Sequence, residues 1–348
     1  MTPASTSDHI VRIAGRPIGT GFPTFVIAEV GINHDGDEAT AARMIDAAAD
    51  AGADAVKFQT VDVAESYMPG TASYDAFQGK DLPLDSLRRL LAQARSRGIV
   101  LFSTPGDAKS LAKMVEAGMP AIKISSGLMT NLPLVAAAAA TGLPLVISTG
   151  MAHLDEVQET VATARQAGGT EMVILQCTSL YPAPADALNL SAMAALAGTI
   201  GCPIGYSDHF DGSLACLAAV ALGACMIEKH FTFDRNEDGA DHHISATPEE
   251  FAALVRDIRI VESMLGDGVK RPTGAELGLR DGRHRVLVTR AAIATGTAFT
   301  PDLFRLMRPM PGTDALPAKR LRDVCSRSAK RDIAADTPVT AADVEGLL

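Results

Sequence analysis

Along this chain, segments with helix-like spacing of apolar residues alternate with short, continuous apolar runs. Seven times the helix-like segment ends in a glycine, such as Gly52 or Gly223, and the next apolar run ends on a polar or ionisable residue. Glycine ends a helix without the penalty that a Cβ imposes in the left-handed conformation. An apolar run of about four to six residues between helices is typical of a parallel strand buried on both faces. With the run at residues 25–30 ahead of them, the pattern predicts eight β–α units.

The predicted fold is a (β/α)8 TIM barrel, because eight such units in about 250 residues match that architecture. The active sites of these barrels are built from residues at the C-terminal ends of the strands. The predicted strands end on Glu29, Lys57 with Gln59, Ser103 with Thr104, Lys123 with Ser126, Ser148, Thr178 with Ser179, Asp208 with His209, and Glu228 with His230. An open, doubly wound parallel sheet is the alternative, and it also binds ligands at the carboxyl ends of its strands.

Composition narrows the choice of partners and compartment. No Trp, an aromatic share of 4% and a formal charge of −10 argue against binding to nucleic acid. A small anionic substrate would need locally placed cations, and Lys57 and Lys123 are such cations. The N-terminus lacks a signal-peptide pattern, and the most apolar stretch, residues 132–148, is interrupted by Gly142 and Pro144, so we expect no membrane span. Five cysteines without CxxC spacing favour a reducing cytoplasm.

The C-terminal part of the chain has a different pattern. A last barrel helix is expected from Pro248 to Leu265, with Thr247 as its N-cap. The barrel is therefore assigned to residues 1–266, and residues 267–282, rich in glycine and charge, are predicted to be a linker. From 283 to 348, short β-branched runs alternate with turns, and Lys and Arg outnumber Asp and Glu. We expect a small, mostly-β, basic domain after an acidic barrel.

Short motifs along nearly the whole chain carry a resemblance to a known family. They include IAEVGINHDGD from Ile27, GADAVKFQT from Gly52, KISSG from Lys123 and GYSDH from Gly205. In this order they resemble the sialic acid synthase family, transferases that condense phosphoenolpyruvate with an N-acylated amino-hexose to a nine-carbon 2-keto acid. The tail, with its Arg308-Pro turn, looks like the antifreeze-like (SAF, β-clip) domain that follows the barrel in these enzymes.

Two histidines, His209 and His230, end consecutive predicted strands and should converge at the barrel mouth. Each stands near a carboxylate in the sequence, Asp208 or Glu228, and a neighbouring carboxylate fixes the tautomer of a ligating imidazole. We therefore interpret the pair as a metal site rather than as core histidines. The resemblance implies Mn²⁺, or alternatively Mg²⁺ or Co²⁺, as a Lewis acid that polarises the sugar aldehyde.

The remaining strand-end residues receive roles from burial and from the resemblance. Glu29 ends an apolar strand, so its pKa should be raised for acid–base catalysis, unless it caps the amides of residues 31–36. By resemblance, the carboxylate of phosphoenolpyruvate is held by Lys57, Thr104, Lys123 and Ser126, and its phosphate by Ser148, Ser179 and Ser207. By resemblance, the sugar side consists of Gln59, Leu128, Tyr181 and Asp241, with Arg308 reaching in from the other subunit of a homodimer whose C-terminal domains are exchanged.

Leu128 departs from the pattern of the family. Sialic acid synthases carry an acidic residue here that contacts sugar hydroxyls, whereas a leucine cannot accept a hydrogen bond. A hydroxyl buried against it without a partner would cost about 1–3 kcal/mol. Unless Leu128 points into the core, we expect a substrate less hydroxylated than N-acetylmannosamine, such as a 2,4-diacetamido-2,4,6-trideoxy-hexose.

Two other functions fit the sequence pattern. One is a Schiff-base aldolase with Lys57 or Lys123 as nucleophile, because barrels host such lysines. The other is a carbohydrate-binding protein that kept the fold without catalysis. Borohydride trapping of a lysine would identify the first, and phosphate release from phosphoenolpyruvate and sugar would exclude the second.

Overall fold

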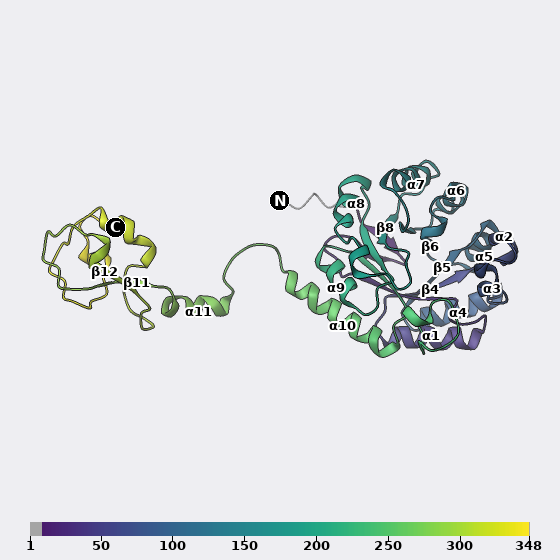
Figure 1. Ribbon diagram of the computed structural model, residues 1–348, viewed down its shortest axis with the longest axis horizontal. Helices are drawn as coiled ribbons and strands as arrows, with labels where there is room; N and C mark the ends of the chain where they lie inside the picture. Colours follow the sequence, from purple (N-terminus) through teal and green to yellow (C-terminus); the bar gives the residue numbers. More distant parts are fainter. Residues whose placement is uncertain (1–8, 348) are drawn as a thin grey trace. The chain divides into compact units, whose positions relative to one another are not determined.

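The chain forms two compact units, one that ends at Gly266 and one that begins at Asp267 (Figure 1). The computed structural model describes residues 9–347. The first unit is a closed barrel of parallel strands with helices around it, so the predicted (β/α)8 fold is confirmed. Among the residues described, no helix is long and apolar enough to cross a membrane.

All eight predicted apolar runs form strands of the barrel. They are β3 (Phe25–Gly31), β4 (Ala55–Thr60), β5 (Val100–Pro105), β6 (Ile122–Ile124), β7 (Leu145–Ser148), β8 (Met172–Cys177), β9 (Ile204–Asp208) and β10 (Met226–His230). Consecutive strands pair in parallel, and β10 returns to β3 with His230 opposite Glu29. This last pairing closes the barrel and excludes the open sheet.

Helices follow the barrel strands and cover their outer side (Figure 1). The longer ones are α1 (Glu38–Asp50), α4 (Leu84–Ser96), α5 (Ala108–Ala117), α6 (Leu132–Ala139), α7 (Leu154–Gln166), α8 (Ala192–Ile200), α9 (Leu214–Ala221) and α10 (Pro248–Leu265). Two short helices, α2 (Val63–Ser66) and α3 (Ala72–Phe77), lie between β4 and α4. The bounds of α10 are those predicted, and a capping box of Thr247 and Glu250 begins it.

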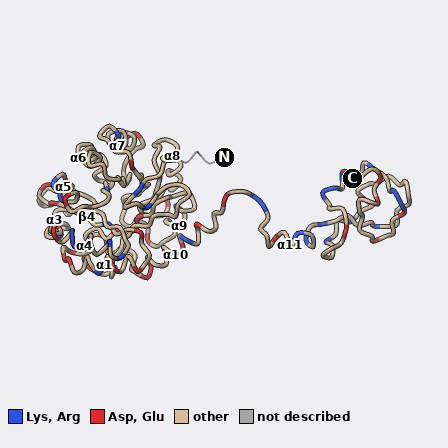
Figure 2. Tube along the Cα trace, turned by 180° about the vertical axis from the view of Figure 1, so that it is seen from behind, with Lys and Arg blue, Asp and Glu red and all other residues tan. Residues whose placement is uncertain are grey.

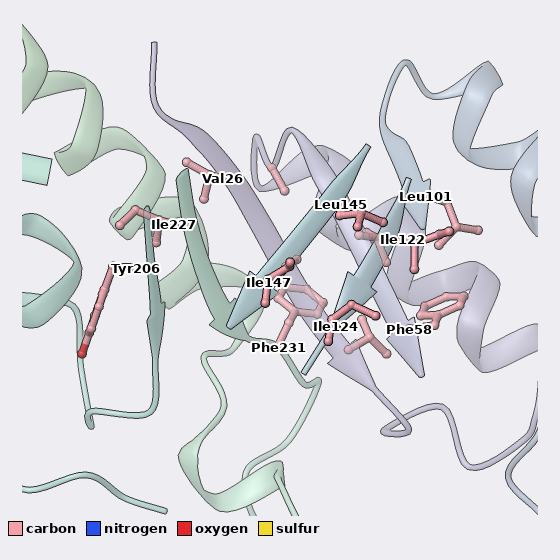
Figure 3. Close-up of a cluster of buried hydrophobic side chains, with 14 of the residues drawn as sticks. Val26, Phe58, Leu101, Ile122, Ile124, Leu145, Ile147, Tyr206, Ile227 and Phe231 are labelled. Atoms are coloured by element: carbon pink, nitrogen blue, oxygen red, sulfur yellow. The ribbon is translucent and has the colours of Figure 1, made fainter. Parts of the chain in front are cut away.

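Side chains alternate between the two faces of each barrel strand. The outward side chains form one apolar layer against the helices, which includes Val26, Phe58, Ile124, Ile147 and Ile227 (Figure 3). The inward side chains near the strand N-termini form a separate apolar cluster, which includes Phe25, Ile27, Phe102, Val146 and Met226. Farther along the same strands, the inward positions become polar. This change in composition confines the polar site to one mouth of the barrel.

A hairpin that the sequence pattern did not predict packs into the opposite, apolar end of the barrel. Strand β1 (Val11–Ile13) pairs antiparallel with β2 (Arg16–Ile18). The side chains of Val11, Ile13 and Ile18 are fully buried in the inner apolar cluster. Neither strand follows a helix-like segment that ends in glycine, which is the repeat that identified the equally short β6.

The second unit surrounds a small core of its own. Strands β11 (Val286–Thr289) and β12 (Phe304–Met307) pair antiparallel, and the core includes Leu287, Phe299, Ile333 and Val339. A short helix, α12 (Leu321–Cys325), and isolated bridges complete it. The stretch predicted as a linker contains a helix, α11 (Gly274–Arg283), which a capping box of Thr273 and Glu276 begins. Basic residues recur along the second unit, as Figure 2 shows.

Candidate active site

The C-terminal mouth of the barrel contains a cavity of about 330 Å³. Twelve of the predicted site residues line it: Glu29, Lys57, Gln59, Lys123, Ser126, Ser148, Ser179, Tyr181, Ser207, His209, His230 and Asp241. Two more, Thr104 and Leu128, line a smaller side pocket of about 160 Å³ that shares Gln59 and Tyr67 with the main cavity. Arg308 belongs to the second unit, and its role in the site stays a prediction.

Two lysines and two glutamates form a buried cluster of ion pairs in the cavity. Lys57 Nζ lies 2.6 Å from Glu29 Oε2 and 3.9 Å from Glu228 Oε2, and Lys123 Nζ lies 3.6 Å from Glu228 Oε1. All four residues are buried, so neither lysine is a surface side chain. Taking single charges out of water costs several kcal/mol each, and alternating signs offset that cost.

Glu228 was missing from the predicted site. Its Oε1 accepts a hydrogen bond from Ser207 Oγ at 2.8 Å, in addition to the contacts with both lysines. Burial opposes its ionisation, but Lys123 and Lys57 together lower the pKa of Glu228 below its ordinary value. The strand alternation could have found it, because Glu228 stands two residues before His230 and therefore faces inward like the histidine.

Hydroxyl groups complete the surroundings of the two ammonium groups. Lys57 Nζ donates to Thr104 Oγ1 at 3.0 Å, and Lys123 Nζ donates to Ser148 Oγ at 2.7 Å. Thr104 thus supports Lys57 from the side pocket and does not line the main cavity.

Glu29 is placed to exchange a proton near neutral pH. Burial raises the pKa of Glu29 to about 7, although Lys57 opposes the rise. Its Oε1 accepts a hydrogen bond from Gln59 Nε2 at 3.2 Å. The carboxyl group contacts these two side chains, so the alternative role as a cap for the amides of residues 31–36 is not supported by its contacts.

A glycine keeps space open between Ser126, predicted to hold the carboxylate of phosphoenolpyruvate, and Ser179, predicted to hold its phosphate. The Gly150 N–H donates to Ser126 Oγ at 2.9 Å. A Cβ at position 150 would lie 2.8 Å from Ser126 Oγ and would overlap Ser179 Oγ. Only glycine therefore leaves this polar corner free for the oxygens of a ligand.

The two histidines lie side by side, with ring centroids 5.3 Å apart. His209 Nδ1 is 2.8 Å from the Thr178 carbonyl oxygen and donates a hydrogen bond to it, so Nε2 is the nitrogen of this ring that could bind an ion. His230 Nδ1 is buried without a hydrogen-bond partner among the described residues, and Asp241 Oδ2 is 3.8 Å away. Burial lowers the pKa of His230 well below its ordinary value. Two adjacent imidazoles of this kind fit a divalent metal ion.

The carboxylates expected to orient these histidines do not contact them. Asp208 bonds Lys229 behind the strands, and Glu228 bonds the lysines deeper in the barrel. Neighbours along a strand point to opposite faces, so Asp208 cannot reach the imidazole of His209. The Thr178 carbonyl orients that ring instead.

A second group of potential metal ligands lies outside the cavity. It consists of Asp35, Glu237 and His242, of which only the histidine is buried. Asp35 is paired with Lys80 at 2.7 Å, and His242 Nδ1 is hydrogen-bonded to Thr232 Oγ1 at 2.7 Å. Because these groups have partners, the histidine pair in the cavity fits an ion better.

The sequence and fold of this chain match those of known proteins. Residues 44–270 match the NeuB family, and residues 284–345 match the SAF domain. The chain belongs to the NeuB family. The resemblance seen in the sequence motifs is thereby confirmed.

Relatives of this NeuB-family chain align over most of its length. The N,N'-diacetyllegionaminic acid synthase of Legionella pneumophila is 38% identical over 90% of this chain and 92% of its own. The pseudaminic acid synthase of Helicobacter pylori is 29% identical over 93% and 98%. The crystal structure of N-acetylneuraminic acid (sialic acid) synthetase from Leptospira borgpetersenii, in complex with citrate, superimposes with a TM-score of 0.73 at 36% identity, over 78% of this chain and 95% of that one.

Stability should depend on the proton of Glu29. The folded-state pKa, about 7, lies above the ordinary value of 4.5, so the folded protein binds this proton more tightly than the unfolded chain does. The contribution of Glu29 to stability therefore falls as pH rises from about 4.5 through 7. Glu29→Gln stays neutral, so in metal-free protein the Tm of the variant minus that of wild type should increase between pH 5 and pH 8. A difference that is flat across this range would contradict the raised pKa.

Proposed function

We propose that this chain is a nonulosonic acid synthase, a transferase that condenses phosphoenolpyruvate with an N-acylated amino-hexose to a nine-carbon 2-keto acid and phosphate. The observation that carries the proposal is the composition of one cavity: two buried lysines, a series of serine hydroxyls and two adjacent imidazoles. Support also comes from the NeuB relatives, which are named as synthases of legionaminic, pseudaminic and neuraminic acids.

The charge balance of the cavity suits a polyanionic substrate. Lys57 and Lys123 provide ammonium groups for the carboxylate, with Thr104 and Ser126 beside them, and Ser148, Ser179 and Ser207 provide hydroxyls for the phosphate. Without substrate, the lysines are neutralised by Glu29 and Glu228. If Glu29 takes up a proton as the substrate binds, Lys57 becomes available to the substrate carboxylate. A pKa of about 7 makes that uptake inexpensive near neutral pH.

His209 and His230 would hold a divalent ion, Mn²⁺ in our proposal and Mg²⁺ or Co²⁺ as alternatives. When bound, such an ion supplies Lewis acidity toward the aldehyde oxygen of the sugar. The Thr178 carbonyl orients the His209 ring for this task. The ring of Tyr181 covers His209 at a centroid distance of 4.0 Å and limits access of water from that side.

The proposed reaction begins when C3 of phosphoenolpyruvate attacks the aldehyde carbon, which forms the new C–C bond. The aldehyde oxygen takes up a proton, and water adds at C2 and loses one. The C2 hydroxyl of the tetrahedral centre then gives up its proton, the C–O bond to phosphate breaks to leave the ketone, and the departing phosphate oxygen takes up that proton. Glu29 is the residue of the cavity placed to move protons between these oxygens, because its carboxyl group titrates near neutral pH.

The Schiff-base alternative needs a neutral amine on Lys57 or Lys123. Burial alone would lower the pKa of Lys57, but Glu228 and Glu29 outweigh burial and raise it. Burial does lower the pKa of Lys123, yet this ammonium group is paired with Glu228. The cavity therefore suits binding of anions better than nucleophilic catalysis by a lysine.

The sugar is, in our proposal, a 2,4-diacetamido-2,4,6-trideoxy-hexose. Leu128 is half-buried and lines the side pocket with Val61, Tyr67 and Gly106, and no charged residue lines this pocket in the described part of the chain. A neutral pocket with an apolar wall suits an acetamido or methyl group better than a hydroxyl or a phosphate. Two relatives named N,N'-diacetyllegionaminic acid synthase, at 38% and 36% identity, support this choice.

The proposed assembly is a homodimer with exchanged C-terminal domains, in the reducing cytoplasm. All five cysteines are free thiols, which supports a reducing compartment. The basic second unit complements the acidic charge of the first, and Arg308 is an exposed cation of that unit.

Removing either imidazole should abolish metal binding. We expect His209→Ala and His230→Ala to lose Mn²⁺ binding in calorimetry and to lower phosphate release from phosphoenolpyruvate and sugar by orders of magnitude, with little change in Tm. His9→Ala, an exposed histidine outside the cavity, is the matched control. Wild-type turnover in either variant, or in wild type saturated with chelator, would refute the metal site.

Leu128 should set the choice of sugar. We expect wild type to have a higher kcat/KM for 2,4-diacetamido-2,4,6-trideoxymannose than for N-acetylmannosamine. Leu128→Glu should shift the ratio toward N-acetylmannosamine by about tenfold to a hundredfold, whereas Leu128→Met should leave it nearly unchanged. A wild-type preference for N-acetylmannosamine would overturn this assignment.

Exchange of domains should allow complementation between inactive subunits. We expect Arg308→Ala and His230→Ala to be inactive alone, and mixed dimers to regain activity, because one of their two sites contains only native residues. The check is phosphate release from a purified heterodimer with two different affinity tags. Heterodimers without recovered activity would rule out the exchange.

A further inference from the structure

A buried ion pair lies directly behind the two site histidines. Asp208 precedes His209 at the end of β9, and Lys229 precedes His230 at the end of β10. The two residues are register partners where these strands pair. Lys229 Nζ is 2.8 Å from Asp208 Oδ2, and the side chains are 2% and 0% exposed.

The pair stands in a layer where the other outward residues of the barrel strands are uncharged. Cys216 Sγ of α9 donates to Asp208 Oδ2 at 3.2 Å, which places the carboxylate between the barrel and this helix. The corresponding outward side chains near the ends of β4, β6 and β7 are Phe58, Ile124 and Ile147 (Figure 3). Replacing a buried ion pair by well-packed apolar groups is often neutral or stabilising, so stability alone does not account for these charges.

The hydrogen bonds of the pair converge on the backbone around His209. Asp208 Oδ1 accepts from Phe210 N and from Tyr206 Oη, each at 2.9 Å. Lys229 Nζ also donates to the Phe210 carbonyl oxygen. Lys229 of β10 therefore contacts both neighbours of His209, namely Asp208 and Phe210. Because His230 follows Lys229 in the sequence, this one side chain connects the backbone at both histidines.

We propose that Asp208 and Lys229 are positioning residues that hold the two imidazoles at the separation a divalent ion requires. They touch neither substrate nor ion and act through the ends of β9 and β10. The inference rests on the metal site of the proposed function. The inference explains why a charged pair joins β9 and β10, the two neighbouring strands that end on the proposed metal ligands.

The test separates metal affinity from stability. Asp208→Asn combined with Lys229→Met removes both charges, so no single buried charge is left unpaired. We expect this double variant to keep its Tm within a few degrees, to bind Mn²⁺ about 10- to 100-fold more weakly by electron paramagnetic resonance, and to keep its affinity for phosphoenolpyruvate. The control is Asp54→Asn with Arg259→Met, which removes an ion pair of 3.1 Å between the residue before β4 and α10. Neither residue lines the cavity, and this pair is more exposed than Asp208 and Lys229.

Each outcome decides the matter. Unchanged Mn²⁺ affinity in the double variant, with or without a lower Tm, would reduce the pair to a structural role and overturn the inference. If the double variant does not fold, two single variants replace it: Lys229→Arg, which keeps the charge, and Lys229→Met, which removes it. We expect Lys229→Arg to bind Mn²⁺ within about threefold of wild type and Lys229→Met to bind it more weakly than that. Equal Mn²⁺ affinity in these two variants would overturn the inference. If wild type binds Mn²⁺ no better than His209→Ala measured in parallel, the proposed metal site itself would be refuted instead.

Discussion

Two lysines and two glutamates are buried together in the barrel mouth, and the chemistry of the site depends on how their charges offset one another. Each charge would be costly alone, and the arrangement of Lys57 between Glu29 and Glu228 lets all of them be desolvated. For Glu29, the attraction of Lys57 does not fully offset the cost of burying the charge, so burial raises the pKa of Glu29 to about 7. In the proposed function, the uptake of a single proton by Glu29 prepares this cluster to bind the anionic substrate.

Closure of the barrel brings the members of this cluster together from distant parts of the sequence. Glu29 and His230 are opposite each other only because β10 pairs with β3. The apolar inner cluster, completed by the hairpin of β1 and β2, fills the other end of the barrel and leaves one polar mouth. Alternation along each strand then separates two functions: inward residues form the cavity, and outward residues such as Asp208 and Lys229 connect the strands that carry them.

The sequence predicted most of this arrangement because parallel barrel strands, buried on both faces, leave an unmistakable apolar run. The polar residues at the ends of these runs include most of the predicted residues that line the mouth, but Ser103 and Asp208 do not line it. The prediction missed the hairpin strands, which lie outside the repeat of helix and apolar run. It also missed α11, because the glycine-rich composition of that stretch suggested a linker although a capping box begins a helix there. The carboxylate partners of the histidines were misassigned for a different reason: Asp208 is next to His209 in the sequence but on the opposite face of the strand.

The central claim is that this cavity forms the new C–C bond and that phosphate then leaves by cleavage of the bond between C2 and the bridging oxygen. The most direct measurement uses phosphoenolpyruvate labelled with ¹⁸O in the bridging position, together with Mn²⁺ and the diacetamido sugar, and follows the released phosphate by ³¹P NMR. Attack of water at C2 predicts that all of the bridging ¹⁸O appears in the phosphate. Phosphate that lacks the label, with ¹⁸O retained in the keto acid, would show P–O cleavage and contradict the account.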